Sequence, residues 1–111
     1  MTAAAPAEQR ERVLIEGELN IYRAADIKAM LHGALQRCAT LEVDLAGVTE
    51  IDSAGLQVLM LTKQLARSDG RALHLLGHSP AVLEVFELLD LGAWFGDALV
   101  MAPHPAGAGR S

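Results

Sequence analysis

Apolar and polar residues alternate over residues 41–45 (LEVDL), and this alternation predicts a strand with one buried face. Soon afterwards, residues 56–67 contain no Gly or Pro and are rich in strong helix formers, so they predict a helix over 54–68. Asp52 and Ser53 therefore lie where the exit of a strand turns into a helix. Both are favoured N-cap residues, because a short side-chain oxygen can accept a bond from an unpaired N–H of the first turn.

The rest of the chain predicts further strands and helices around this corner. Apolar residues at helical spacing indicate a helix over 24–37, and Ser79 followed by Pro80 predicts the start of a third helix over 80–89. Short apolar runs predict strands, and the Trp94-Phe95 pair predicts a turn that closes the bottom of the core. The expected strands cover residues 12–18, 19–22, 41–45, 71–76 and 98–100.

This order of elements predicts an α/β fold. Strands that alternate with helices are usually parallel and joined by right-handed crossovers, whereas the first two strands are close enough to pair as a hairpin. We therefore expect a mixed sheet of four to five strands with helices packed mainly on one face and a partly wet opposite face. Residues 1–11 are expected to be a flexible N-terminus, 12–101 one domain, and 102–111 a disordered tail.

Composition narrows the classes of function. The chain has 111 residues, of which 51% are hydrophobic and 21% charged, as expected for one domain with a packed core. Its net charge of −5 argues against direct binding of nucleic acid. Cys38 is the only cysteine, so no intrachain disulfide forms. No apolar run is long enough to insert into a membrane, and the N-terminus does not read as a signal peptide, so we expect a cytoplasmic protein.

Few residues have the arrangement of a catalytic site. Residues 77–81 (GHSPA) begin like a nucleophile elbow, but the closing Gly is Ala81, and capping explains Ser79 and Pro80. Asp44 and Asp52 could form a carboxylate pair, although a solvated face and a helix cap explain them better. The histidines lack metal-ligand spacing, so we expect no enzyme, metal or cofactor. These histidines are His32, His74, His78 and His104.

The local geometry at Ser53 would tolerate a modified serine, although an Asp-Ser pair at a helix start is usually only a cap. A phosphate on Ser53 would lie beside the free N–H groups and the positive end of the helix dipole, so the helix start would tolerate it. The alternative is that Ser53 only caps the helix.

Helical spacing also predicts that Leu56 and Met60 point away from the sheet on the same side as Ser53, where they would form a surface for a partner.

The sequence resembles a STAS domain, and most closely the small bacterial anti-sigma factor antagonists. The similarity covers roughly residues 12–101. The matching segments are GEL (17–19), Leu45 with VTEIDSAGL (48–56), the Gly70 turn, GHSPAV (77–82), and Leu91 with Phe95.

The resemblance implies a switch that performs no catalysis. In this family the antagonist binds an anti-sigma factor, which is a serine kinase of the histidine-kinase-like ATPase fold, and so frees a sigma factor. The kinase phosphorylates the serine that follows the Asp, which is Ser53 here, and a serine phosphatase restores the antagonist. One departure is Asn20, where many members have Asp. The implied partner-binding residues are Asn20, Asp52, Ser53, Ala54, Gly55, Leu56, Gln57 and Met60.

The resemblance leaves other functions open. STAS modules also serve as the small subunit that contacts the ATPase of a bacterial lipid-trafficking ABC importer, and others act on chemosensory signalling partners. A scaffold of this kind would bind its partner without regard to the state of Ser53. A small hydrolase that uses Ser79 is the third alternative.

Overall fold

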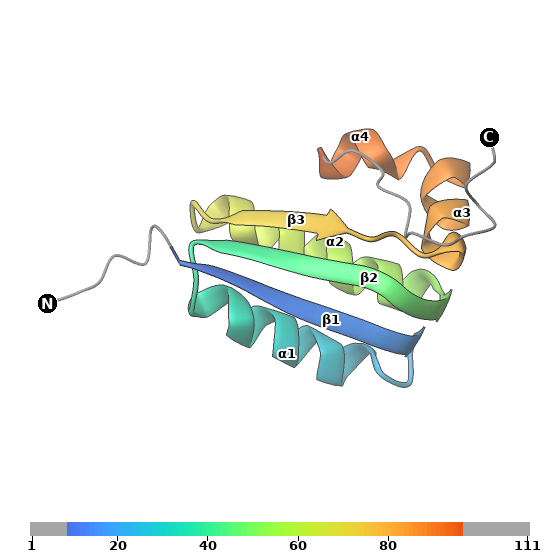
Figure 1. Ribbon diagram of the computed structural model, residues 1–111, viewed down its shortest axis with the longest axis horizontal. Helices are drawn as coiled ribbons and strands as arrows, with labels where there is room; N and C mark the ends of the chain where they lie inside the picture. The colour runs from blue at the N-terminus through green and yellow to red at the C-terminus, as the bar shows by residue number, and fades with distance from the viewer. Residues whose placement is uncertain (1–8, 97–111) are drawn as a thin grey trace, which may run out of the picture.

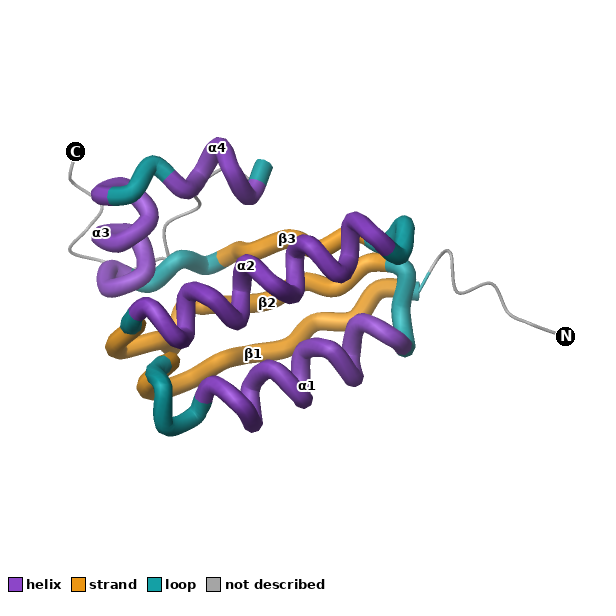
Figure 2. The backbone as a smooth tube through the Cα atoms, turned by 180° about the vertical axis from the view of Figure 1, so that it is seen from behind, coloured by secondary structure: helices purple, strands orange, loops and turns teal. Residues whose placement is uncertain are grey.

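The computed structural model describes residues 9–96, and it builds them into three strands and four helices. The elements in chain order are β1 (Arg10–Leu19), α1 (Ala24–Gln36), β2 (Thr40–Ile51), α2 (Ser53–Ser68), β3 (Ala72–Leu76), α3 (Pro80–Leu88) and α4 (Leu91–Phe95). The strands form one sheet in the order β1-β2-β3, and both neighbouring pairs are parallel. Helices α1 and α2 return the chain to the start of the sheet, and they lie across the same face of it (Figures 1 and 2).

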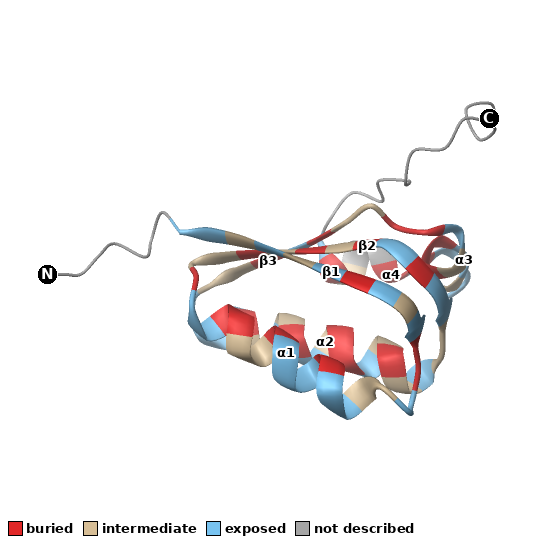
Figure 3. Ribbon diagram, turned by 60° about the horizontal axis from the view of Figure 1, so that its bottom comes forward, coloured by how far each residue is buried: buried red, intermediate tan, exposed pale blue. Residues whose placement is uncertain are grey.

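The core lies between this face of the sheet and the two crossover helices. Figure 3 shows the buried residues of α1 and α2 turned toward the sheet. The alternation predicted for residues 41–45 is confirmed, since the three aliphatic residues of that run are almost fully buried and the two acidic residues between them are partly exposed. Aliphatic residues from every strand and from both crossover helices fill this core, and its largest members include Ile15, Leu19, Leu31, Leu35, Leu41, Leu45, Leu59 and Leu73.

The opposite face of the sheet is polar, as the alternation predicted. Glu42 forms ion pairs there with Arg10 at 2.8 Å and with Arg12 at 3.2 Å. The hydrogen bond from Arg10 is the main reason why the pKa of Glu42 lies below its ordinary value. Leu14 is 58% exposed on the same strand. Helices α1 and α2 therefore bury one face of the sheet, and the other face carries ion-paired side chains together with the exposed Leu14.

The predicted N-terminal hairpin is wrong. β1 continues as one strand to Leu19 through two irregularities, one of them next to Gly17, whose positive φ of 83° suits a residue without a Cβ. The chain then turns over residues 20–23 into α1, because the Arg23 N–H donates to the Asn20 carbonyl at 3.0 Å. Within residues 9–96 the sheet has three parallel strands instead of a mixed set of four to five. The strand expected at 98–100 lies outside the described residues.

Two expected boundaries also change. Arg10 already pairs with Thr40, so β1 begins two residues before the expected start of the first strand at residue 12. β2 extends to Ile51 because that residue still pairs with Leu19 beyond the irregularities of β1. The predicted closure of the core near the C-terminus is confirmed at Phe95, which is 1% exposed. The tail 102–111 lies outside the described part of the chain.

Candidate partner-binding site at the start of α2

Asp52 joins the first residues of α2 to the loop between β1 and α1. Its Oδ1 accepts the Gly55 N–H at 2.9 Å, and its Oδ2 accepts the Ile21 N–H at 3.1 Å. Its own N–H donates to the Leu19 carbonyl at 3.2 Å. The Gly55 N–H is the largest cause that holds the pKa of the Asp52 carboxyl below its ordinary value, and the Ile21 N–H adds to it against the opposing effect of desolvation. Asp52 is thus confirmed as the N-cap, and it also fixes the neighbouring loop.

Gly55 allows this corner to close. A Cβ at this position would lie 2.1 Å from the Leu19 carbonyl oxygen and 2.7 Å from Leu19 Cγ, which is far inside van der Waals contact. Only a glycine therefore lets the first turn of α2 pack against the end of β1. Gly55 is buried, so its role in the expected partner surface is to shape that surface from below.

Ser53 is exposed at the first position of α2. The cap belongs to Asp52, and within residues 9–96 no hydrogen bond involves the Ser53 side chain. The hydroxyl is therefore accessible to another protein, and the hydrogen bonds that hold the corner together come from its neighbour. The loop after β1 and the start of α2 lie together at one end of the sheet (Figure 1), and Ser53 is the first residue of α2.

Asn20 organises the loop that Asp52 holds. Its side chain is 7% exposed; Nδ2 donates to Glu18 Oε1 at 3.0 Å, and Oδ1 accepts the Tyr22 N–H at 3.1 Å. The amide uses one donor and one acceptor at once. A carboxylate at this position could accept from Tyr22 but could not donate to Glu18. The structure therefore explains why an Asn fits a position that the resemblance associates with Asp.

Two exposed residues of this loop were missed by the sequence analysis. Ile21 is 65% exposed and Tyr22 is 90% exposed, although both were expected to lie in a strand. The Ile21 N–H donates to Asp52, the neighbour of Ser53 in the sequence, and an exposed tyrosine is a typical anchor of protein–protein interfaces. The sequence did hold a signal for this loop, because Ile21 and Tyr22 fit neither the alternation of a strand nor the spacing of a helix.

The α2 residues of the expected surface divide into two groups. Gln57 is exposed, while Ala54 is half-buried. Leu56 and Met60 do not point fully away from the sheet as expected, since both are half-buried and pack against the core.

The other sequence candidates take structural roles. Ser79 is 1% exposed and its Oγ accepts the Val82 N–H at 3.2 Å, so it caps α3 as predicted and is not placed as a nucleophile. Over residues 9–96 no three His, Cys, Asp or Glu side chains are grouped to hold a metal ion. None of the helices in this part of the chain is long and apolar enough to cross a membrane.

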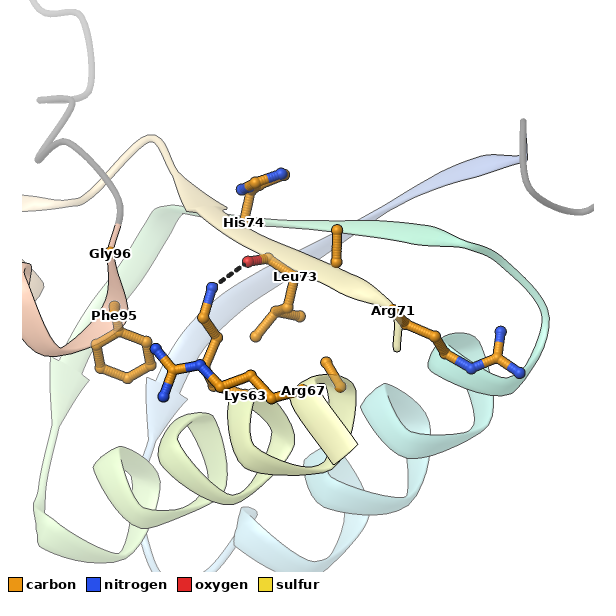
Figure 4. Close-up of a pocket in the computed structure, with 9 residues that line it drawn as sticks. Lys63, Arg67, Arg71, Leu73, His74, Phe95 and Gly96 are labelled. Carbon is orange, nitrogen blue, oxygen red and sulfur yellow. Dashed lines mark hydrogen bonds between the residues drawn. The ribbon is translucent and has the colours of Figure 1, made fainter. Parts of the chain in front are cut away.

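A hollow of about 220 Å³ lies beside β3, where Lys63 and Arg67 enter it from α2 (Figure 4). Lys63 Nζ donates to the Leu73 carbonyl at 2.7 Å. The Arg67 guanidinium donates to the Trp94 carbonyl at 3.0 Å and lies over the Trp94 ring at 5.2 Å from its centroid. These contacts join α2 to β3 and α4, and Arg67 stays exposed while it makes them.

A parallel α/β domain whose second crossover helix starts with a capping Asp and an exposed Ser has the features of a STAS domain. The chain belongs to the STAS domain family: the family model described as "Mlab, STAS domain" matches residues 3–101. The expected resemblance is thereby confirmed. No curated protein matches the sequence.

Solved structures of anti-sigma factor antagonists share the fold. Unphosphorylated SpoIIAA is 21% identical with a TM-score of 0.66, over 90% of this chain and 85% of that chain. A protein of Thermotoga maritima described as an anti-sigma factor antagonist is 23% identical with a TM-score of 0.66, over 87% and 83%. Phosphorylated SpoIIAA from Bacillus is 21% identical with a TM-score of 0.61, over 87% and 85%. At these identities the similarity shows the fold.

Proposed function

We propose that this STAS domain is a non-catalytic regulator that binds a partner protein through the surface around Ser53 and releases it when Ser53 is phosphorylated. The proposed partner is an anti-sigma factor that is also a serine kinase of the histidine-kinase-like ATPase fold. In this proposal the protein is an anti-sigma factor antagonist that acts in the cytoplasm, and a serine phosphatase returns it to the binding state.

The division of roles between Asp52 and Ser53 carries the proposal. Asp52 supplies the cap and the bond to the β1–α1 loop, so the Ser53 hydroxyl is exposed and not required by the fold. A kinase can therefore reach it. The added phosphate would meet the positive end of the α2 dipole, so phosphorylation is expected to leave the domain folded.

Binding is expected to respond strongly to that phosphate. It adds about −1.5 to −2 charges at pH 7, directly beside the Asp52 carboxylate. Ile21, whose N–H donates to Asp52, and Gln57, one turn along α2, are exposed and uncharged. A partner that packs closely on these uncharged side chains would have to bury the new charge without a counter-ion. The free-energy cost of burying an unpaired charge is larger than the binding free energy that one interface residue ordinarily contributes.

Two measurements on the same sample test the proposal: the identity of the captured partner and the phosphorylation of Ser53. The chain is purified from its native host with and without stress, its intact mass is measured, and bound proteins are identified. We expect a fraction with one phosphate on Ser53 and a nucleotide-binding kinase bound only to the unmodified fraction. The purified partner is then titrated against Ser53→Asp and Ser53→Ala.

Ser53→Asp is expected to abolish binding, and Ser53→Ala is expected to keep it. Ala29→Asp, which adds the same charge to an exposed position of α1, is the matched control and should bind like the natural chain. Equal urea midpoints for all variants would show that the fold is intact. Full binding by Ser53→Asp, or a Ser53 that stays unmodified in every condition, would refute the switch.

A second candidate follows from the family model, whose description names Mlab. In that case the chain would be an adaptor that binds the ATPase of a lipid-trafficking ABC transporter through the same surface. Such an adaptor would co-purify with an ABC ATPase at fixed stoichiometry and would never carry a phosphate. The identity of the captured protein therefore decides between the two.

A further inference from the structure

One exposed strip of α2 carries no charged residue, although Arg67 is exposed beside it. The only charged side chains of this helix, Lys63 and Arg67, turn toward β3 and α4, where backbone carbonyls accept their N–H groups (Figure 4). The exposed residues of the remaining surface recur every three or four positions and are uncharged. We call them the α2 stripe, which consists of Ser53, Gln57, Leu61, Gln64 and Ser68.

An uncharged exposed helix face is unusual because a solvated face normally carries Lys and Glu. Depletion of charged residues is the compositional sign of the centre of a protein–protein interface. The α2 stripe begins at Ser53, so it continues the proposed partner surface along the whole helix. With 16 residues in α2, the stripe is about 24 Å long.

A groove between α1 and α2 borders this stripe. It has a volume of about 430 Å³, and the apolar part of its lining comes from Leu61 and Leu65. Leu61 is 37% exposed, which leaves an aliphatic side chain available to a partner. The full lining consists of Lys28 and His32 from α1 and of Leu61, Gln64, Leu65 and Ser68 from α2.

The charge of the groove is positive and comes from one residue. None of the lining residues is acidic, although the chain as a whole has a net charge of −5. Burial, and then the nearby charge of Lys28, lower the pKa of His32 below its ordinary value of 6.5, so the imidazole is neutral at pH 7. Lys28 is therefore the charged group that a docked segment would meet.

We propose that the groove between α1 and α2 receives an amphipathic helix of the protein that binds at Ser53, with an apolar side chain on Leu61 and Leu65 and a carboxylate beside Lys28. The inference rests on the proposed function and adds a second, phosphate-independent contact to it. A helix laid into an apolar groove is a common mode of recognition. The length of the α2 stripe, the two leucines in the lining and the single positive charge together favour this occupant.

The test uses a pair of matched substitutions. Leu61→Glu places a carboxylate on the floor of the groove, and Met30→Glu makes the same change at an α1 residue that does not line it. The two side chains are similarly exposed, at 37% and 42%, so both variants should fold with similar urea midpoints. Each is titrated with the purified partner from the Ser53 experiment.

We expect Leu61→Glu to weaken binding by about tenfold or more, as substitution of an interface anchor does, and Met30→Glu to bind like the natural chain. Lys28→Glu should also weaken binding, because it repels the proposed carboxylate. A photo-crosslinking residue at position 61 should attach to one partner peptide that is helical, apolar on one side and acidic at its edge.

The outcomes separate this inference from the proposed function. If Ser53→Asp abolishes binding while Leu61→Glu binds like Met30→Glu, the groove proposal is overturned and the proposed function stands. If no variant affects binding, both are overturned. If Leu61→Glu changes the self-association of the chain alone, measured by light scattering, the occupant is a second copy and the proposal is overturned.

Discussion

Replacing Gly55 with Ala tests whether the close contact between α2 and β1 holds the site together. The new Cβ would lie 2.1 Å from the Leu19 carbonyl oxygen. Since that oxygen belongs to the backbone of a paired strand, it cannot rotate away as a flexible side chain would. The start of α2 must therefore move outward from β1.

Two opposing effects set the size of the change. Alanine gains about 1 kcal/mol over glycine in a helix. Against this, overpacking costs about 1–3 kcal/mol, and the outward movement weakens the backbone hydrogen bond to the Leu19 carbonyl, worth about 1 kcal/mol. The balance is a loss of about 2 kcal/mol in the free energy of unfolding.

Urea unfolding followed by far-ultraviolet circular dichroism measures this loss. With a slope of about 2 kcal/mol per molar urea, the midpoint should fall by about 1 M. Gly33→Ala is the control, because its nearest new neighbour is the end of the Arg37 side chain at 3.7 Å, and it should raise the midpoint through helix propensity alone. If Gly55→Ala raises the midpoint as much as Gly33→Ala, the close contact does not constrain the site.

Three further predictions concern titratable groups. Asn20→Asp should lower the free energy of unfolding by about 1–2 kcal/mol at pH 7, because it puts a carboxylate where Nδ2 donates to Glu18. The loss should be smaller near pH 4, as a comparison of urea midpoints at the two pH values would show. The pKa values of Asp52 and Glu42 are lowered in the folded chain, so both carboxylates stabilise the fold above their unfolded pKa of about 4. This stability disappears as the pH falls through their folded pKa values. Asp52→Asn should therefore lose less free energy of unfolding than the natural chain when both are titrated with acid. Burial raises the pKa of the Cys38 thiol, so a thiol reagent should react with it only as urea unfolds the chain.

Local patterns predicted the crossover part of the fold well. The alternation of residues 41–45 identified the buried and the polar face of β2, and the Asp-Ser pair located the start of α2. These features depend on neighbours in the sequence, such as a side chain that caps the N–H three residues later. Periodicity and capping rules describe contacts of that range.

Contacts between distant residues account for the errors. Nothing near residues 12–22 indicated that β1 would stay continuous past Gly17, because its partner is β2, about thirty residues later. The same error hid Ile21 and Tyr22, which were assigned to a strand. Helical spacing placed Leu56 and Met60 away from the sheet, but the packing of α2 against the core half-buries both, and this depends on the tertiary structure.

Within the site, residues that serve the fold alternate with residues that face outward. Asp52 and Gly55 are held by the backbone of Leu19 and Ile21, so a change at either one disturbs the corner itself. Ser53 lies between them and makes no such contact, which allows its charge to change while the corner remains closed. A changed carboxyl at Asp52 or an added side chain at Gly55 would loosen the domain, whereas the modification proposed at Ser53 would act on the surface alone. The arrangement therefore suits a signal that is read by a partner and later reversed.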